Sequence, residues 1–199
     1  MKLSYLIIFI LLLQSCLTGK LEPSNKNFTL KKILSENTKS YIYRADFRLY
    51  DNNFSGLLIL KNQNKSRRIV FINEIGMKFF DLELFADSFK IHHIFGPMNK
   101  KMFINLLVDD FNFMLMNNID SNSENFIDKK TGNLVLKQKN VKEIYYFDKN
   151  TLLPKSAEKY SLIRKIVFIK YKNYRNKIPK HINIKHKNIK FEMNLTFIK

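Results

Sequence analysis

Residues 189–197 read Ile189-Lys190-Phe191-Glu192-Met193-Asn194-Leu195-Thr196-Phe197, and apolar and polar side chains alternate along the whole stretch. A period of two places successive side chains on opposite faces of a β-strand. We therefore expect a strand over residues 189–198 with one face toward a hydrophobic core and the other toward water. The inward residues that are candidates for the wall of a cavity are Phe191, Met193 and Leu195.

The same alternation recurs upstream in short stretches separated by turn signals. Asp51-Asn52-Asn53 is one turn, and Asn73-Glu74-Ile75-Gly76-Met77 is a tight connection between two strands. The repeated helices that a parallel sheet requires do not appear in the pattern. We therefore predict a mainly β (α+β) fold, an antiparallel curled sheet or half-open barrel with one amphipathic helix inserted midway. The other expected strands are 41–50, 54–60, 67–72, 78–85, 89–95, 133–139, 142–148, 156–162, 165–171 and 180–187.

One long segment follows a helical period instead. After Gly96-Pro97, apolar residues recur at spacings of three and four over residues 98–116, which predicts an amphipathic helix with a wide apolar face. We expect this face to pack against the concave side of the sheet. A short helix is expected over residues 28–34 and a polar loop over 117–130. The helix residues that are further candidates for the cavity wall are Leu106, Leu107 and Phe111.

The first residues have the three parts of a secretory signal peptide. Lys2 supplies a positive charge, and residues 6–13 form an apolar run that is far shorter than the roughly 20 residues needed to span a bilayer. The run ends in Leu13-Gln14-Ser15-Cys16, which looks like a lipobox. We expect cleavage of the signal peptide, residues 1–15, and attachment of lipid to the Cys16 thiol, with acyl chains such as palmitate holding the protein on a membrane.

Cys16 is the chain's one cysteine, so its place in the lipobox favours an anchor over an ordinary cleaved signal in which the cysteine is incidental. A tether over residues 16–27 and a single domain over 28–199 would follow. The next residue, Leu17, is not the aspartate that typically retains such proteins in the inner membrane. We therefore expect a location in the cell envelope, in the outer membrane and facing the periplasm.

The composition is that of a folded, strongly basic domain. Hydrophobic residues make up 45% of the chain and the formal net charge is +18. Export and the predominance of lysine over arginine argue against nucleic acid as a partner. A basic surface next to anionic lipid headgroups favours contact with a membrane instead.

The order of elements resembles the LolA/LolB superfamily of periplasmic lipoprotein carriers and related outer-membrane lipoproteins. The resemblance rests on the turn 73–77, the helix 98–116 and the closing strands, which begin with Ile178-Pro179-Lys180-His181-Ile182-Asn183-Ile184. The stretches at residues 54–60, 74–78 and 97–101 are similar to a group of small lipoproteins thought to share that fold.

The resemblance implies a half-open barrel whose apolar interior receives acyl chains. It also implies that a membrane-anchored member accepts lipoproteins and delivers them to the outer membrane. In the family, an exposed apolar residue on a loop between early strands contacts the membrane, and Ile75 and Met77 occupy a comparable place here. The alternative is that both side chains are simply buried at a strand end.

The titratable residues do not suggest catalysis or a metal site. His92 and His93 are adjacent, His181 and His186 are expected to point to opposite faces, and no carboxylate or cysteine stands at ligand spacing beside either pair. Asp81 and Glu83 share a strand face, which a solvated sheet surface explains. We therefore expect no enzyme activity, no catalytic residues, no metal and no cofactor.

Two functional classes remain open. The first is a lipid-anchored protein that binds an acyl chain or a lipoprotein in a β half-barrel. The second is a structural or interaction lipoprotein of an envelope complex whose barrel is filled by aromatic side chains and binds no lipid. The chain has 18 Phe and 9 Tyr, and the same rings are able to line a cavity or to fill it.

Overall fold

The computed structural model describes residues 21–24, 30, 33–35, 39–120 and 122–199. The expected signal peptide, the lipid-attachment residue Cys16 and most of the expected helix at residues 28–34 lie outside the described residues. The fold can therefore be compared with the sequence expectations from β1 onward.

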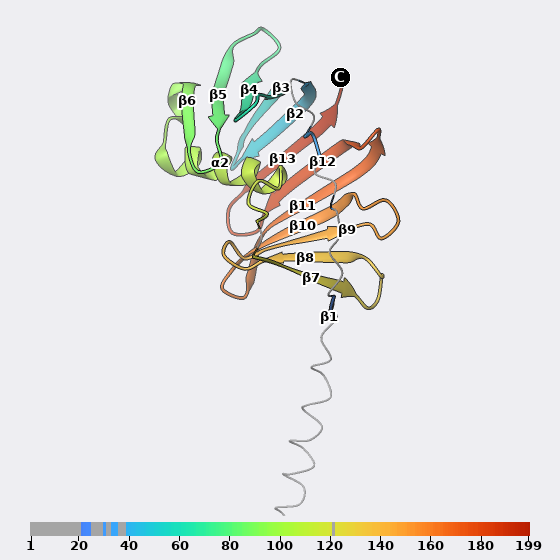
Figure 1. Ribbon diagram of the computed structural model, residues 1–199. Helices are drawn as coiled ribbons and strands as arrows, with labels where there is room; N and C mark the ends of the chain where they lie inside the picture. The colour runs from blue at the N-terminus through green and yellow to red at the C-terminus, as the bar shows by residue number, and fades with distance from the viewer. Residues whose placement is uncertain (1–20, 25–29, 31–32, 36–38, 121) are drawn as a thin grey trace, which may run out of the picture.

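A single antiparallel sheet dominates the molecule (Figure 1), and within the described residues it contains thirteen strands. The sheet is curled and unclosed, with β1 at one edge and β6 at the other, in the order β1-β7-β8-β9-β10-β11-β12-β13-β2-β3-β4-β5-β6. This architecture confirms the predicted fold class. The strands are β1 Leu21–Pro23, β2 Ser40–Leu49, β3 Asn52–Asn62, β4 Arg67–Ile72, β5 Lys78–Leu84, β6 Phe89–Ile94, β7 Ser123–Asp128, β8 Leu134–Gln138, β9 Glu143–Phe147, β10 Pro154–Ser161, β11 Arg164–Arg175, β12 Ile178–His186 and β13 Phe191–Phe197.

The last strand joins the two halves of the sheet, because β13 lies between β12 and β2. Met193 is opposite Phe47 of β2 and Ile184 of β12. Alternate residues of β13 are buried, as the period of two predicted, while Asn194 and Thr196 are exposed. Register is strongly specified here, since a shift by one residue would turn the whole apolar set toward water.

The inserted helix, α2 (Lys101–Met114), follows a single 3₁₀ turn, η2 (Gly96–Met98), in which Pro97 occupies the start. The helix crosses one face of the sheet (Figure 1) and buries its apolar side against it. The predicted helix is therefore confirmed, with slightly shorter bounds than 98–116. It ends at Met114, two residues before Met116, whose φ of 57° is incompatible with a continuing helix.

The polar loop expected over residues 117–130 is wrong in part, because this stretch contains β7. The sequence Ser-Glu-Asn-Phe-Ile-Asp shows no alternation, and all six residues are partly buried. The strand forms through pairing with β8 on one side and with β1 on the other. β1 itself lies within the residues expected to be a tether. Strands near a sheet edge need no buried face, so a hydrophobic pattern does not reveal them.

Candidate apolar binding site

The cavity-wall candidates meet in the interior between β13 and α2. The exposed fraction is 2% for Phe191, 1% for Leu195 and 0% for Met193, Leu107 and Phe111. Leu106, which lies to the side of the helix, is half-buried. The other five side chains are almost completely buried and are in packed contact with other protein atoms.

Aromatic rings fill the space between helix and sheet. Phe111 of α2 lies 5.9 Å from Phe80, measured between ring centroids, and Phe103 lies 6.3 Å from Phe191. Phe191 is also 6.3 Å from Phe47 on the neighbouring strand. Tilted and edge-on pairs at these separations are favourable beyond the area they bury. The apolar face of α2 therefore occupies the concave side of the sheet, where a bound acyl chain would have to lie.

Polar contacts hold the second half of α2 to the sheet. The two carboxylate oxygens of Asp110 lie 3.0 and 2.8 Å from Nε2 of His186 on β12, and both side chains are buried. Burial raises the pKa of Asp110, and the neighbouring His186 opposes that rise. The hydroxyl of Tyr171 donates a hydrogen bond of 2.8 Å to the Met114 carbonyl, and Tyr145 lies 3.5 Å from the Phe113 carbonyl. We call these contacts the latch.

The first turn of α2 lacks such stabilisation. Lys100 occupies the N-cap position without a side-chain cap, and the first turn holds no acidic residue. Uncapped backbone N–H groups and the positive charge of Lys101 both disfavour a helix at its N-terminus. The beginning of α2 is therefore held mainly by its apolar contacts, and its end by the latch as well.

The sequence reasoning missed Asp110, His186 and Tyr171 as functional candidates. Two signals were available. His186 has the same parity as the inward residues Ile182 and Ile184 of β12, and Asp110 interrupts the apolar stripe of the helix. A titratable residue on a buried face usually has a partner, although the sequence does not say which one.

Four cavities lined by described residues have volumes between 320 and 570 Å³. The largest, 570 Å³, lies beside the β12–β13 turn and is bordered by Arg48, Lys185 and Lys190 among others. Of the cavity-wall candidates, Phe191 lines the largest cavity and Leu195 lines another. The other candidates, Leu106, Leu107, Phe111 and Met193, line none of these four. The cavities that border the core thus have largely polar or charged rims.

The membrane-contact candidates lie on the β4–β5 turn. Ile75 is 88% exposed and Met77 is 40% exposed. The Asn73 carboxamide oxygen accepts hydrogen bonds from the backbone N–H groups of both residues, at 3.2 and 2.8 Å, and Gly76 supplies a φ of 82°. The two side chains are therefore presented to solvent by an ordered turn, and not buried at the strand end.

Gly56 of β3 allows this turn to form where it does. A Cβ atom at Gly56 would lie 2.0 Å from the Ile72 carbonyl oxygen, so a larger residue would push the end of β4 away. The close approach of the two backbones explains why glycine stands within an otherwise apolar strand.

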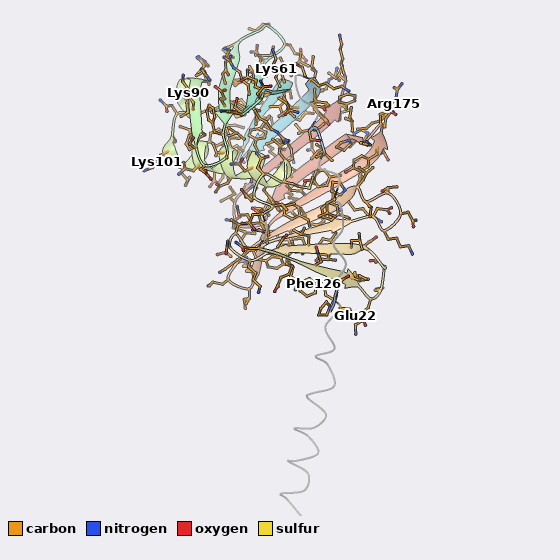
Figure 2. The ribbon with its side chains drawn as sticks, viewed as in Figure 1. Glu22, Lys61, Lys90, Lys101, Phe126 and Arg175 are labelled. Atoms are coloured by element: carbon orange, nitrogen blue, oxygen red, sulfur yellow. The ribbon has the colours of Figure 1, made fainter. Side chains whose placement is uncertain are left out.

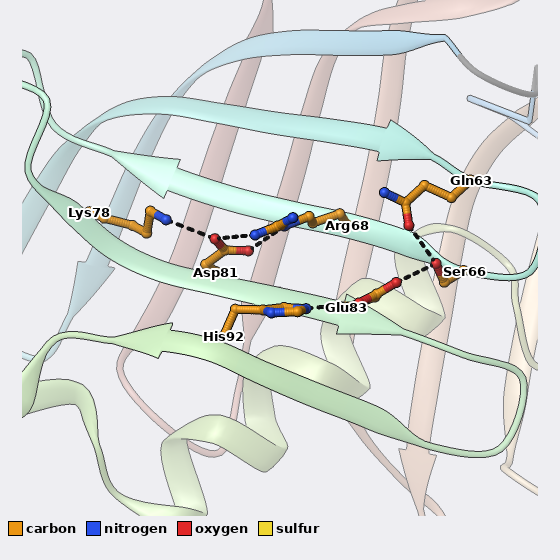
Figure 3. Close-up of polar contacts among 7 residues, drawn as sticks. All are labelled: Gln63, Ser66, Arg68, Lys78, Asp81, Glu83 and His92. Atoms are coloured by element: carbon orange, nitrogen blue, oxygen red, sulfur yellow. Dashed lines mark hydrogen bonds and ion pairs between the residues drawn. The ribbon is translucent and has the colours of Figure 1, made fainter.

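The face of β4, β5 and β6 that points away from α2 has a polar network (Figure 3). This network corrects the prediction that Asp81 and Glu83 lie on a solvated sheet surface. The Asp81 side chain is only 1% exposed because Arg68 and Lys78 bind it, at 2.8 Å each. Burial by itself raises the pKa of Asp81, but hydrogen bonds and charge from both partners outweigh it and lower the pKa to about 2. Glu83 accepts a hydrogen bond from Ser66 and pairs with His92 at 2.8 Å.

The histidines likewise have carboxylate partners that the spacing did not predict, namely Glu83 for His92 and Asp110 for His186. Each is a two-residue contact between different strands or between strand and helix. No group of three or more residues able to hold a metal ion occurs among the described residues. In the described part of the chain, no helix combines the length and the apolar character needed to span a bilayer.

No family model matches the chain, and no curated protein matches it in sequence. Among solved structures, a DUF1329 family protein from Desulfovibrio piger ATCC 29098 is similar with a TM-score of 0.50 and 10% identity, over 81% of this chain and 85% of that chain. A protein domain from Vibrio parahaemolyticus described as outer membrane lipoprotein-sorting gives a TM-score of 0.48 and 11% identity, over 82% and 85%. At such identity the first likeness shows the fold alone, and the fold of this chain is the curled, unclosed antiparallel sheet with one inserted helix that the sequence predicted.

Proposed function

We propose that this chain is an outer-membrane-anchored envelope lipoprotein that holds an acyl chain, free or on a lipoprotein, in its half-open sheet once α2 has moved away. The observation that carries the proposal is the position of α2, whose apolar face fills the concave side of the sheet. The expected lipid on Cys16 supplies the anchor.

The exchange of helix for ligand is physically reasonable, because both bury the same surface. Removing α2 would uncover a trough of aromatic and aliphatic side chains that includes Phe47, Phe80 and Phe191. An acyl chain regains roughly 0.8 kcal/mol for each CH₂ group it buries there. A chain of many CH₂ groups thus compensates for the contacts that the helix loses.

The latch sets the free-energy difference between the closed and open states. A ligand that binds only the open state has an apparent affinity reduced by the fraction of molecules that are open. Weakening a latch contact should therefore tighten binding, which a role in stability alone would not do. The contrast between two buried tyrosines tests this reasoning.

Tyr171→Phe removes the hydrogen bond to the Met114 carbonyl of α2, and Tyr43→Phe removes one of 3.0 Å to the Pro179 carbonyl within the sheet. Each loss costs about 1 kcal/mol. We expect Tyr171→Phe to raise the affinity for a fluorescent fatty acid up to about five-fold, and Tyr43→Phe to leave it unchanged. The measurement is a fluorescence titration of the domain from residue 21 onward, with thermal melting of both variants.

Equal affinities for the two variants would argue against displacement of α2. If the parent itself binds no acylated probe at protein concentrations well above micromolar, the carrier role is wrong. The second candidate would then stand, an interaction lipoprotein with a filled barrel. The complete burial of Leu107, Phe111 and Met193 is the observation that favours it.

A further inference from the structure

The four most exposed of the large hydrophobic side chains in the described residues belong to turns or to a helix start. They are Ile163 at 96%, Ile75 at 88%, Leu162 at 81% and Met102 at 76%. Leu162 and Ile163 together form the two-residue loop of the β10–β11 hairpin. Neither the packing of the fold nor the proposed acyl-binding site explains why these two side chains are apolar.

The β10–β11 loop has an unusual sequence for its backbone. Leu162 has a φ of 54°, in the left-handed region that a two-residue hairpin loop fills with glycine or asparagine. A bulky residue there is strained, and both side chains point into solvent, so neither contributes to the core. Leu162 disfavours the backbone of the turn, and two exposed aliphatic side chains lower solubility. Their presence therefore indicates a function for the exposed side chains.

Neighbouring turns lie beside this loop at the same end of the sheet, on the left of the lower strands in Figure 1. Backbone hydrogen bonds connect them in sequence: Tyr160 N–H to Lys142 O, Lys187 N–H to Ile166 O, and Tyr50 N–H to Lys190 O. The β8–β9, β10–β11, β12–β13 and β2–β3 turns therefore form one continuous rim. In Figure 2, Lys101 lies toward this end of the molecule and Arg175, at the end of β11, lies at the other.

Three turns of the rim share a pattern of aliphatic residue followed by cation. They read Lys139-Asn140-Val141-Lys142, Ser161-Leu162-Ile163-Arg164 and Lys187-Asn188-Ile189-Lys190, and none of them contains a carboxylate. At the opposite end, the β7–β8 and β9–β10 turns begin with an aspartate, Asp128 or Asp148, whereas the β11–β12 turn has Arg175 and Lys177 and no carboxylate. Arg164, Lys187 and Lys190 form no ion pair within the described part of the chain.

We infer that this rim docks on an anionic lipid bilayer, with Leu162 and Ile163 entering the interfacial zone and the rim cations meeting lipid phosphates. Aliphatic side chains flanked by lysine and arginine suit that boundary, where apolar contact and attraction to anionic headgroups act together. Tyr50, half-exposed on the adjoining β2–β3 turn, is a residue type enriched at the same depth. The cavity of 570 Å³ beside it, bordered by Arg48, Lys185, Lys187 and Lys190 together with Asp51 and Glu192, is large enough for a headgroup.

This inference goes beyond the proposed function, because it concerns how the domain sits on a membrane and does not require an acyl chain inside the sheet. A failure of the fatty-acid titration would leave it standing. Its own failure would likewise leave the acyl-binding proposal open. The two are therefore tested by separate measurements.

The experiment places a fluorophore on the loop of the full chain. Ile163→Cys is labelled with a polarity-sensitive nitrobenzoxadiazole and reconstituted into vesicles of phosphatidylethanolamine and phosphatidylglycerol, or of phosphatidylcholine alone. The matched control is Asn150→Cys on the β9–β10 turn, which is also exposed but lies at the opposite end. The parent chain, labelled in the same way, gives the background from Cys16.

In the anionic vesicles, we expect emission from position 163 to shift to the blue and to be quenched by brominated acyl chains. Both effects should be smaller in phosphatidylcholine. Emission from position 150 should show neither effect. A second variant, Leu162→Gly with Ile163→Ser, separates docking from folding. It relieves the left-handed backbone, so its melting temperature should stay the same or rise, while quenching of a label at Asn188→Cys should fall several-fold.

Equal emission from positions 163 and 150 in both kinds of vesicle would overturn the inference. Shielding of position 163 in native membranes but not in vesicles would also overturn it, because a protein partner would then cover the loop.

Discussion

At the scale of single residues, the buried pair of Asp110 and His186 should contribute more than any exposed ion pair. Removing one partner of a buried pair typically costs about 3–5 kcal/mol, because the other is left without compensation. We expect Asp110→Ala and His186→Ala each to lower the free energy of unfolding by this order. The double variant should lose clearly less than the sum, in chemical denaturation followed by circular dichroism.

The pair Glu83 and His92 provides the control, because it also joins a carboxylate and a histidine at 2.8 Å but lies on the outer face of the sheet. Partly exposed pairs contribute about 0.2–1 kcal/mol. The coupling free energy from its double-mutant cycle should therefore be smaller than that of Asp110 and His186. Additive losses at the buried pair would show that the contact does not fix α2 to β12.

Individual partners were the least predictable feature from the sequence. Asp110 and His186 are 76 residues apart, and no local spacing connects them. Parity along each element gives the face of a residue but not the neighbour it meets. For Asp81, alternation predicted the correct face but the wrong environment, because Arg68 and Lys78 cover a carboxylate that was expected to lie in water.

At the scale of elements, the packing of α2 can be tested by placing a charge on each of its two faces. Leu107 is fully buried against the sheet, and Met102, five residues earlier in the helix, is exposed. Truncating a buried leucine costs about 2–5 kcal/mol, and an unpaired carboxylate adds to that cost. We expect Leu107→Asp to unfold or strongly destabilise the domain, and Met102→Asp to stay within about 0.5 kcal/mol of the parent. Thermal melting measures both.

A Leu107→Asp protein that melts within a few degrees of the parent would show that this face of α2 is not packed in solution. Such a result would favour a largely open helix and would strengthen the carrier role. A Met102→Asp protein that unfolds would instead contradict the exposed position of the first helical turn.

Elements with one buried face were predictable, and elements without one were not. The long strands β2, β12 and β13 and the helix α2 have a clear hydrophobic period, and β3 was predicted from a nearly continuous apolar run. Each lies within a few residues of its expected bounds. β1 and β7 were missed because their pairing is satisfied by neighbouring backbone and not by an apolar stripe. The concave face shows a different limit of periodicity. The pattern predicts which residues point inward but not whether the helix or a ligand covers them.

At the scale of the whole molecule, the curled sheet separates three surfaces with different physical character. The concave face is apolar and covered by α2, the outer face of β4 to β6 carries the network around Asp81, and one rim carries exposed aliphatic side chains beside cations. The net charge of +18 and the small number of acidic residues in the rim turns both favour contact with anionic lipid. Such a surface would act together with the lipid anchor that the sequence predicts at Cys16.

The anchor itself is predicted to be the lipid on Cys16, and its chemistry makes the prediction specific. Only a thiol can form the expected thioether, so Cys16→Ala should abolish labelling of the protein by a clickable fatty acid. Acyl chains bury enough CH₂ groups to hold a protein on a bilayer when more than one is present. Leu17→Asp is the matched variant, because it keeps the thiol and should still be labelled. We expect it to remain with the inner membrane and the parent to fractionate with the outer membrane. Labelling of the Cys16→Ala chain as strong as that of the parent would mean that the lipid, if any, is attached elsewhere.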